Sequence, residues 1–127
     1  MQTPSLRTSL YVPGDRPERF DKALHSGADS VIIDLEDAVA DAAKPHAREH
    51  AVDWLRSNPG TPAWVRVNNR SDLLSVDLDA ISPVSGLGVV IPKADLAACA
   101  QASLPVVALI ETSVGVVQAR EIAALPN

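Results

Sequence analysis

Five short apolar runs rich in β-branched residues, each followed by a segment of helical character, constrain the fold of this chain most strongly. The last run, residues 106–110, leads directly into Glu111 and Thr112 and is bounded by Pro105 and Gly115. Such a run predicts a strand buried on both faces, as in parallel sheets. Functional groups in parallel α/β folds gather just beyond the carboxyl ends of the strands. Glu111 therefore stands where a metal ligand or general base would stand, although it could equally stabilise the start of the next helix.

The remaining runs repeat this pattern along the chain. We expect five strands, near residues 8–12, 30–34, 63–67, 88–91 and 106–110. Helices are expected after Asp15, which is placed to cap the first of them, and over residues 44–55, 73–81, 95–102 and 114–125. Polar side chains follow four of the strands, at Asp34 to Asp37, at Arg66 and Asn68, at Lys93 and at Glu111. The pattern is a βα unit repeated five times, which defines the α/β class.

Two architectures are compatible with this alternation, namely part of a (βα)8 barrel and a complete open doubly wound sheet. A closed barrel needs about 250 residues, so 127 residues amount to about half of one. The first turn, Pro13 to Pro17, lacks the glycine fingerprint of a dinucleotide site, and no P-loop pattern is present. The chain ends at Asn127, where another strand is expected to begin. We therefore expect a fragment or truncated product of a larger barrel, folded as a single domain over residues 1–127.

Composition and charge exclude several classes of protein. The net charge of −5, from 11 basic and 16 acidic residues, argues against binding to nucleic acid. Cys99 is the single cysteine, so neither a disulfide nor a zinc framework can form, and a cytoplasmic location is expected. No signal peptide is evident, and no apolar run approaches the roughly 18 residues that span a bilayer.

Five motifs, in order and at suitable spacing, resemble the amino-terminal half of the citrate lyase β-subunit family, which is grouped with the HpcH/HpaI aldolases. They are Leu10–Phe20, Gly27–Val39, Val65–Asn68, Ile91–Ala94 and Ala108–Thr112. Lys44 with Ala47 and Arg48 extends the likeness, which covers essentially the whole chain. The family comprises citryl-CoA, malyl-CoA and citramalyl-CoA lyases.

The resemblance implies a TIM barrel of the phosphoenolpyruvate-binding type, here truncated to five βα units. It also implies a Mg²⁺-dependent or Mn²⁺-dependent carbon–carbon lyase. The substrate would be a 3-hydroxyacyl-CoA thioester such as citryl-CoA or malyl-CoA, and the products an acyl-CoA and a small α-keto acid. By the same resemblance, Glu111 ligates the metal and contacts substrate together with Thr112, and Arg66 contacts the substrate carbonyl or enolate oxygen. Glu36 and Asp37 lie near the metal and its waters as catalytic acids.

The chemistry of the residues agrees with these roles. Retro-aldol cleavage places negative charge on a thioester enolate, which a cation and a fixed hydrogen-bond donor stabilise. Mg²⁺ prefers carboxylate oxygens, and the planar guanidinium of Arg66 suits a carboxylate or enolate. Structural alternatives stay open, because Arg66 could pair with Asp34 and only hold the sheet together. Lys93 could be a solvated strand-end lysine, and a Schiff-base role for it is not expected.

The resemblance also concerns contacts with CoA, the oligomeric state and the part of the barrel that this chain lacks. Arg16, Arg19 and Lys44 are candidates to meet CoA phosphates, although solvated faces are an alternative for them. The family implies a homo-oligomer, a trimer, and places its second metal ligand and three further strands beyond Asn127. We therefore expect residues 1–127 alone to be inactive. The alternative function is a non-catalytic half-barrel module that serves assembly or binds CoA or a metal.

Overall fold

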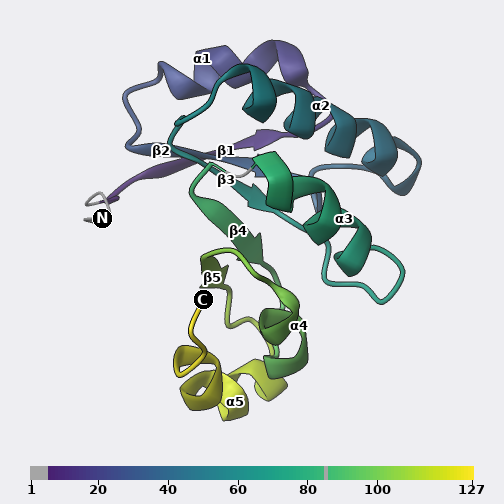
Figure 1. Ribbon diagram of the computed structural model, residues 1–127, viewed down its shortest axis with the longest axis vertical. Helices are drawn as coiled ribbons and strands as arrows, with labels where there is room; N and C mark the ends of the chain where they lie inside the picture. The colour runs from purple at the N-terminus through teal and green to yellow at the C-terminus, as the bar shows by residue number, and fades with distance from the viewer. Residues whose placement is uncertain (1–5, 85) are drawn as a thin grey trace.

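The computed structural model describes residues 6–84 and 86–127, which form a five-stranded parallel sheet covered by helices (Figure 1). The strands are β1 Ser9–Pro13, β2 Ser30–Asp34, β3 Ala63–Arg66, β4 Gly88–Ile91 and β5 Val106–Ala108. The helices are α1 Phe20–Leu24, α2 Lys44–Ser57, α3 Leu74–Ile81, α4 Leu96–Gln101 and α5 Ser113–Ala123. Short 3₁₀ turns cover Pro17–Arg19, Asp41–Ala43 and Ser82–Val84. The five predicted strands and the helices that follow them are thus present, with boundaries within two residues of those expected, except that α1 begins only at Phe20.

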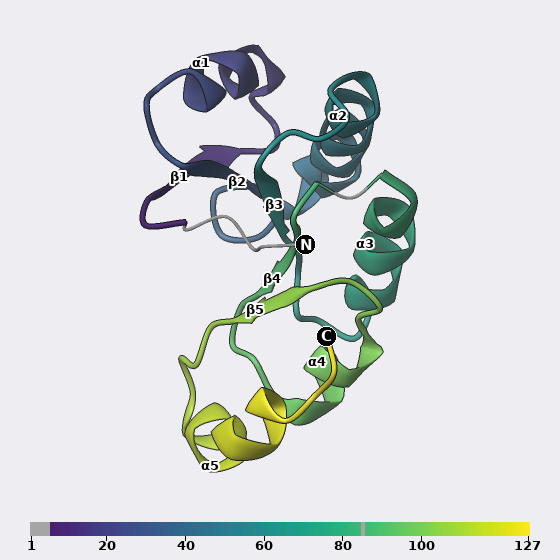
Figure 2. The same ribbon diagram turned by 60° about the vertical axis from the view of Figure 1, so that its left-hand side comes forward.

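The order of the strands bears on the two architectures left open by the sequence. Neighbouring strands in the sheet follow chain order, β1-β2-β3-β4-β5, and all four pairs are parallel. A doubly wound sheet reverses its order at a switch point, which these five strands do not do. Right-handed crossovers in a sequential order place every helix on the same side of the sheet. Figures 1 and 2 show this arrangement, with α1 to α5 following one another along the outside of a curved sheet.

The hydrophobic core lies between the sheet and the helices. Ile33 of β2 and Ile91 of β4 are fully buried in this core. Ile32 and Val90, their neighbours along the chain, are also buried but belong to the opposite face of the sheet. The difference follows from the alternation of side chains along a strand. That opposite face carries Arg66 at its carboxyl end and is the face from which the candidate site is built.

Local sequence accounts for where α2 and α4 begin. Pro45 occupies the first turn of α2, where its missing N–H costs nothing, and α2 buries Ala47, Ala51 and Leu55 against the sheet. The Asp95 side chain caps α4 by accepting a hydrogen bond from the Ala98 N–H at 2.7 Å. Within the described part of the chain, no helix has the length and apolar content needed to cross a bilayer.

Two expectations from the sequence are wrong in detail. The strand expected over residues 106–110 and buried on both faces ends at Ala108, and Val107 is 39% exposed. In the described sheet β5 pairs only with β4, and only its Val106 and Ala108 pack against the core, so apolar composition did not imply full burial. Asp15 does not cap the first helix, because the chain passes through a 3₁₀ turn whose N-cap is Arg16, with no side-chain bond.

A glycine joins the loops that follow the first two strands. The Gly14 N–H donates to the Asp34 carbonyl at 2.8 Å. A Cβ at Gly14 would lie 2.8 Å from that same oxygen and 2.9 Å from Leu35 Cδ2, closer than such atoms approach. Only glycine lets the two loops come this near, and the contact fixes the backbone at the end of β2, where the acidic cluster begins.

Candidate functional site

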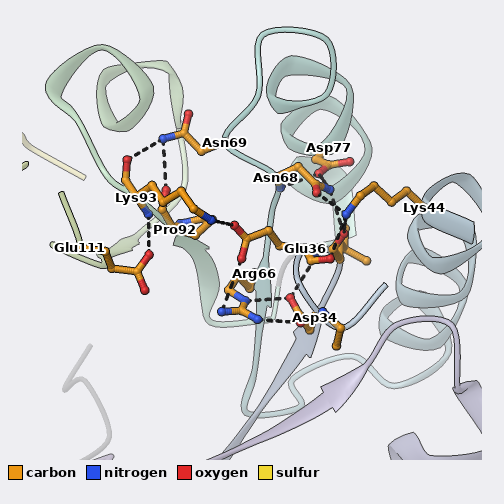
Figure 3. Close-up of polar contacts among 12 residues, drawn as sticks. Asp34, Glu36, Lys44, Arg66, Asn68, Asn69, Asp77, Pro92, Lys93 and Glu111 are labelled. Carbon is orange, nitrogen blue, oxygen red and sulfur yellow. Dashed lines mark hydrogen bonds and ion pairs between the residues drawn. The ribbon is translucent and has the colours of Figure 1, made fainter. Parts of the chain in front are cut away.

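The charged residues predicted at the strand ends meet at the carboxyl edge of the sheet. Strand register pairs Asp34 of β2 with Arg66 of β3. From there a continuous series of polar contacts runs through Glu36 and Lys93 to Glu111 (Figure 3). Loops after β2, β4 and β5 and the end of β3 therefore contribute to one site. The sequence-based expectation that these side chains converge is consistent with this geometry.

Arg66 and Asp34 form the buried end of the series. The Arg66 Nε and NH2 groups each donate to a different Asp34 oxygen at 2.7 Å, a bidentate pair. Burial by itself would raise the pKa of the Asp34 carboxyl. The bond from Arg66 and the backbone N–H groups of Glu36 and Ala38 outweigh burial, so the pKa lies below its usual value. The same bond raises the pKa of Arg66, which therefore remains a cation.

The pair with Asp34 does not use the whole guanidinium. The third nitrogen, NH1, faces Glu36, whose Oε1 lies 3.6 Å away. The ring of Tyr11 lies beneath the guanidinium, with its centroid 4.7 Å from Cζ, so a cation–π contact holds the plane. Asp34 thus fixes the direction of Arg66 and leaves NH1 as the donor that faces Glu36. The two alternatives for Arg66, holding the sheet and meeting a substrate, are compatible with each other.

Glu36 bridges the two cations of the site. Its Oε2 accepts from Lys93 Nζ at 2.7 Å, while Oε1 faces Arg66, and its side chain is only 11% exposed. The bond to Glu36 raises the pKa of Lys93 and keeps the amine protonated, which works against a Schiff-base role. Asp37 is exposed and lines a recess of about 320 Å³ together with Glu36, Asn69 and Lys93.

Lys93 has an unusual backbone that directs its N–H to Glu111. Its φ of 46° lies in the left-handed region, and it is the only such residue other than glycine in the described part of the chain. The Lys93 N–H donates to Glu111 Oε2 at 2.8 Å. The Asn69 side-chain amide donates to the Pro92 and Lys93 carbonyls at 3.1 and 2.9 Å. The turn after β4 is therefore anchored to the loops on both sides.

Thr112 is the N-cap of α5. Its Oγ1 accepts from the Gly115 N–H at 3.0 Å, so this hydroxyl is used in capping the helix. Glu111 precedes it, is exposed, and has one oxygen bound to the Lys93 N–H. In residues 6–84 and 86–127, no hydrogen bond to the other oxygen is found. A role of Thr112 in substrate binding stays a prediction.

The three candidate contacts for CoA phosphates differ in setting. Arg16 and Arg19 are exposed on the segment that follows β1, at the same edge of the sheet as the site. Lys44 is only 5% exposed, and its Nζ donates to the Leu35 carbonyl, the Glu36 carbonyl and Asn68 Oδ1 at 2.7–3.0 Å. That geometry argues against a phosphate contact for Lys44, because all three N–H donors are already used inside the protein.

A buried network around Lys44 was not anticipated from the sequence. Asn68 donates through its backbone N–H and its side chain to Asp77 Oδ2, both at 2.8 Å. The other Asp77 oxygen accepts from Arg48 Nε at 2.7 Å. Asp77 is wholly buried on α3, in a segment for which the sequence predicted only a helix. The one signal in the sequence that could have indicated this network is Asp77 itself, an acid between Val76 and Leu78. The network holds the loop that carries Glu36.

One carboxylate of the site, Glu111, has an oxygen that a divalent cation could use. No group of three or more His, Cys, Asp or Glu residues that could hold a metal occurs among the residues that the structure describes. Mg²⁺ does not require such a cage, since it commonly binds one or two carboxylates and keeps several waters. The Lys93 N–H orients one oxygen of Glu111 and leaves the other available for this purpose.

Comparison with known proteins identifies relatives of the chain. The model of the family described as HpcH/HpaI aldolase/citrate lyase matches residues 7–103. A citrate lyase subunit beta-like protein of Mycobacterium tuberculosis is 43% identical over 117 residues, which are 91% of this chain and 42% of that protein. A (3S)-malyl-CoA thioesterase of Cereibacter sphaeroides is 36% identical, over 99% of this chain and 47% of that protein.

A solved structure shows the same arrangement of the chain. The citrate lyase beta subunit of M. tuberculosis, complexed with oxaloacetate and magnesium, superposes with a TM-score of 0.77 at 43% identity. The match covers 93% of this chain and 53% of that one. The chain thus spans about half the length of the relatives that it matches.

Proposed function

This chain belongs to the HpcH/HpaI aldolase/citrate lyase family, and from that membership we propose that it is part of a Mg²⁺-dependent carbon–carbon lyase. The substrate is a 3-hydroxyacyl-CoA thioester such as citryl-CoA or malyl-CoA, and the products are an acyl-CoA and an α-keto acid. The observation that carries this proposal is the convergence of Arg66, Glu36, Lys93 and Glu111 at the carboxyl edge of the sheet. The sequential strands with their helices outside support one side of a TIM barrel.

The proposed reaction breaks the bond between the carbon next to the thioester and the carbinol carbon. The hydroxyl group loses its proton and becomes a keto group, and the electron pair of the broken bond passes to the thioester as an enolate. The enolate then takes up a proton on carbon to give the acyl-CoA. Arg66 is placed to stabilise that charge, because its NH1 is not used by Asp34 and faces Glu36, which lines the adjoining recess. Its raised pKa means that it donates a hydrogen bond and does not give up a proton.

The acids have separate proposed roles. Glu111 would hold the divalent cation, Mg²⁺ or Mn²⁺, which when bound neutralises charge on the carboxylate and carbonyl oxygens of the keto acid. Glu36 and Asp37 line the adjoining recess and would hold ordered water near that group. The magnesium and oxaloacetate named for the M. tuberculosis structure support this assignment. Arg16 and Arg19 remain proposed contacts for the CoA phosphates, and Lys44 is left out because it is buried.

We also infer that residues 1–127 by themselves do not catalyse the lyase reaction. Of the strand-end acids Asp34, Glu36 and Glu111, only Glu111 has one oxygen held by a bond and another that accepts none from the described residues. On the sheet face that carries Arg66, Tyr11 is 44% and Val107 is 39% exposed. A site open to this extent cannot exclude water from the reacting atoms, which weakens electrostatic stabilisation. Incubation of the chain with malyl-CoA and Mg²⁺ should give no glyoxylate, and robust turnover would contradict this inference.

A chimaera tests the catalytic proposal directly. This chain would replace the matching segment of the M. tuberculosis protein, and the products from citryl-CoA and malyl-CoA would be measured as keto acid and as free CoA thiol. A lyase forms keto acid without free thiol, and Arg66→Gln should reduce its rate at least about 100-fold, as loss of an oxyanion donor does. Arg56→Gln, an exposed arginine of α2, is the matched control.

Two other outcomes would replace the proposal. The relative named as a (3S)-malyl-CoA thioesterase makes thioester hydrolysis a second candidate. Release of free thiol without keto acid by the chimaera would establish that activity. A folded chimaera that binds CoA or Mg²⁺ and releases neither product would instead favour the non-catalytic module for assembly or binding.

A further inference from the structure

The left-handed turn at Lys93 connects the loops that follow β2, β3, β4 and β5. Its backbone N–H binds Glu111, its carbonyl accepts from Asn69, and its ammonium binds Glu36. Figure 3 shows Lys93 between these partners, with Asn69 on one side and Glu111 on the other. These bonds reach three other strand-end loops from a single residue.

The backbone conformation of Lys93 has an energetic cost that the neighbouring bonds offset. A side chain other than glycine in the left-handed region is disfavoured by about 1–2 kcal/mol. Asn69 supplies two hydrogen bonds, to the carbonyls of Pro92 and Lys93, and the Ala94 N–H donates to the Leu109 carbonyl at 2.9 Å. Strained conformations of this kind persist where the surroundings over-determine them, and they cluster at functional sites.

We propose that Lys93, held in its left-handed turn by Asn69, is the positioning residue for both acids of the site. Its backbone N–H orients Glu111, and its ammonium orients Glu36. The inference rests on the proposed function for the meaning of those acids, but the positioning itself is a property of the chain without any ligand. Asn69 acts on Glu111 only through the Lys93 turn, because its amide reaches the two carbonyls.

Lys93 has two interactions with the acids, which we call its two arms: the backbone N–H with Glu111 and the ammonium with Glu36. They can be removed separately. Lys93→Met removes the ammonium but keeps the backbone N–H, so Glu36 should lose its partner while Glu111 keeps its bond. Asn69→Ala removes the support of the turn but keeps the ammonium, so the bond from Lys93 to Glu111 should weaken. Asn58→Ala is a matched control, because the Asn58 amide also donates to a backbone carbonyl, that of Trp54 at 2.9 Å, at the far end of α2.

Carboxyl-carbon NMR and amide hydrogen exchange on the metal-free chain measure each arm. Asn69→Ala should speed hydrogen exchange of the Lys93 amide about tenfold, because weakening its bond to Glu111 removes about the free energy of one hydrogen bond. It should also shift the Glu111 carboxyl resonance. Lys93→Met should shift the Glu36 resonance far more than that of Glu111, which meets the ammonium only through a weaker charge interaction, and Asn58→Ala should move neither. Equal effects of both site variants on both acids, or an unchanged Lys93 amide in Asn69→Ala, would overturn the proposal.

Titration with Mn²⁺ separates this inference from the proposed function. Asn69→Ala should weaken Mn²⁺ binding about tenfold, as loss of an outer-shell partner commonly does, and Asn58→Ala should not change it. If the unaltered chain binds no Mn²⁺ but the two arms respond as expected in the metal-free spectra, positioning stands and the metal site of the proposed function fails. If Mn²⁺ binds at Glu111 with equal affinity in both asparagine variants, the positioning role fails alone.

Discussion

The two ends of the polar series at the sheet edge are built differently. At the β2–β3 end, Asp34 is 1% exposed and holds Arg66 with two bonds of 2.7 Å, above the Tyr11 ring. At the β4–β5 end, Glu111 is exposed and has a single bond, from the Lys93 N–H. A buried, doubly bonded pair fixes direction, whereas an exposed carboxylate with one oxygen available is suited to take up a ligand. We therefore expect structural stability to depend on the first end and ligand binding on the second.

Removal of one carboxylate from each end gives the largest contrast in stability. Asp34→Ala should lower the free energy of unfolding by about 3 kcal/mol, because it leaves the Arg66 charge without its buried partner. Glu111→Ala should change it by less than about 0.5 kcal/mol, because its side chain is exposed. Urea unfolding followed by circular dichroism measures both. Similar losses in the two variants would show that the ends do not differ as their burial indicates.

The buried network extends the rigid end of the site. Lys44→Met keeps the length of the side chain but leaves Asn68 Oδ1 and two loop carbonyls without their donor. We expect a loss of about 2 kcal/mol in the free energy of unfolding, the penalty for buried polar groups without partners. Lys22→Met, on the exposed side of α1, is the control and should stay within about 0.5 kcal/mol. If the two variants unfold alike, the network contributes no net stability.

Acid unfolding gives a smaller effect that sharpens the comparison. Because the folded pKa of Asp34 lies below its value of 3.8 in the unfolded chain, Asp34 contributes stability above that pH. This contribution declines as the pH falls from about 3.8 through the folded pKa, where the carboxylate takes up a proton. The slope of unfolding free energy against pH in this window should therefore be shallower in Asp34→Asn. A slope unchanged by the substitution would mean that another group dominates acid unfolding.

The predictions from sequence succeeded where a local pattern carried the information. Apolar runs bounded by Pro and Gly located the five strands, and the charged residues at the ends of those runs made Arg66, Glu36 and Glu111 candidates, which the structure links through Lys93. They failed for β5, because whether Val107 is covered depends on what lies against its face and not on its own composition. The use of all three Lys44 donors within the protein was equally hidden, since its partners lie 8 to 24 residues away along the chain.

The sequence by itself determined the α/β class, the five βα units, the family and the identity of the strand-end residues, because periodicity and short motifs are local properties. Only the tertiary structure decided the sequential order of the strands and the division of the site into a buried pair and an exposed carboxylate. It also decided the left-handed turn at Lys93. These features depend on which side chains from distant loops reach one another, and Asn69, Glu36 and Glu111 meet Lys93 only after the sheet has formed.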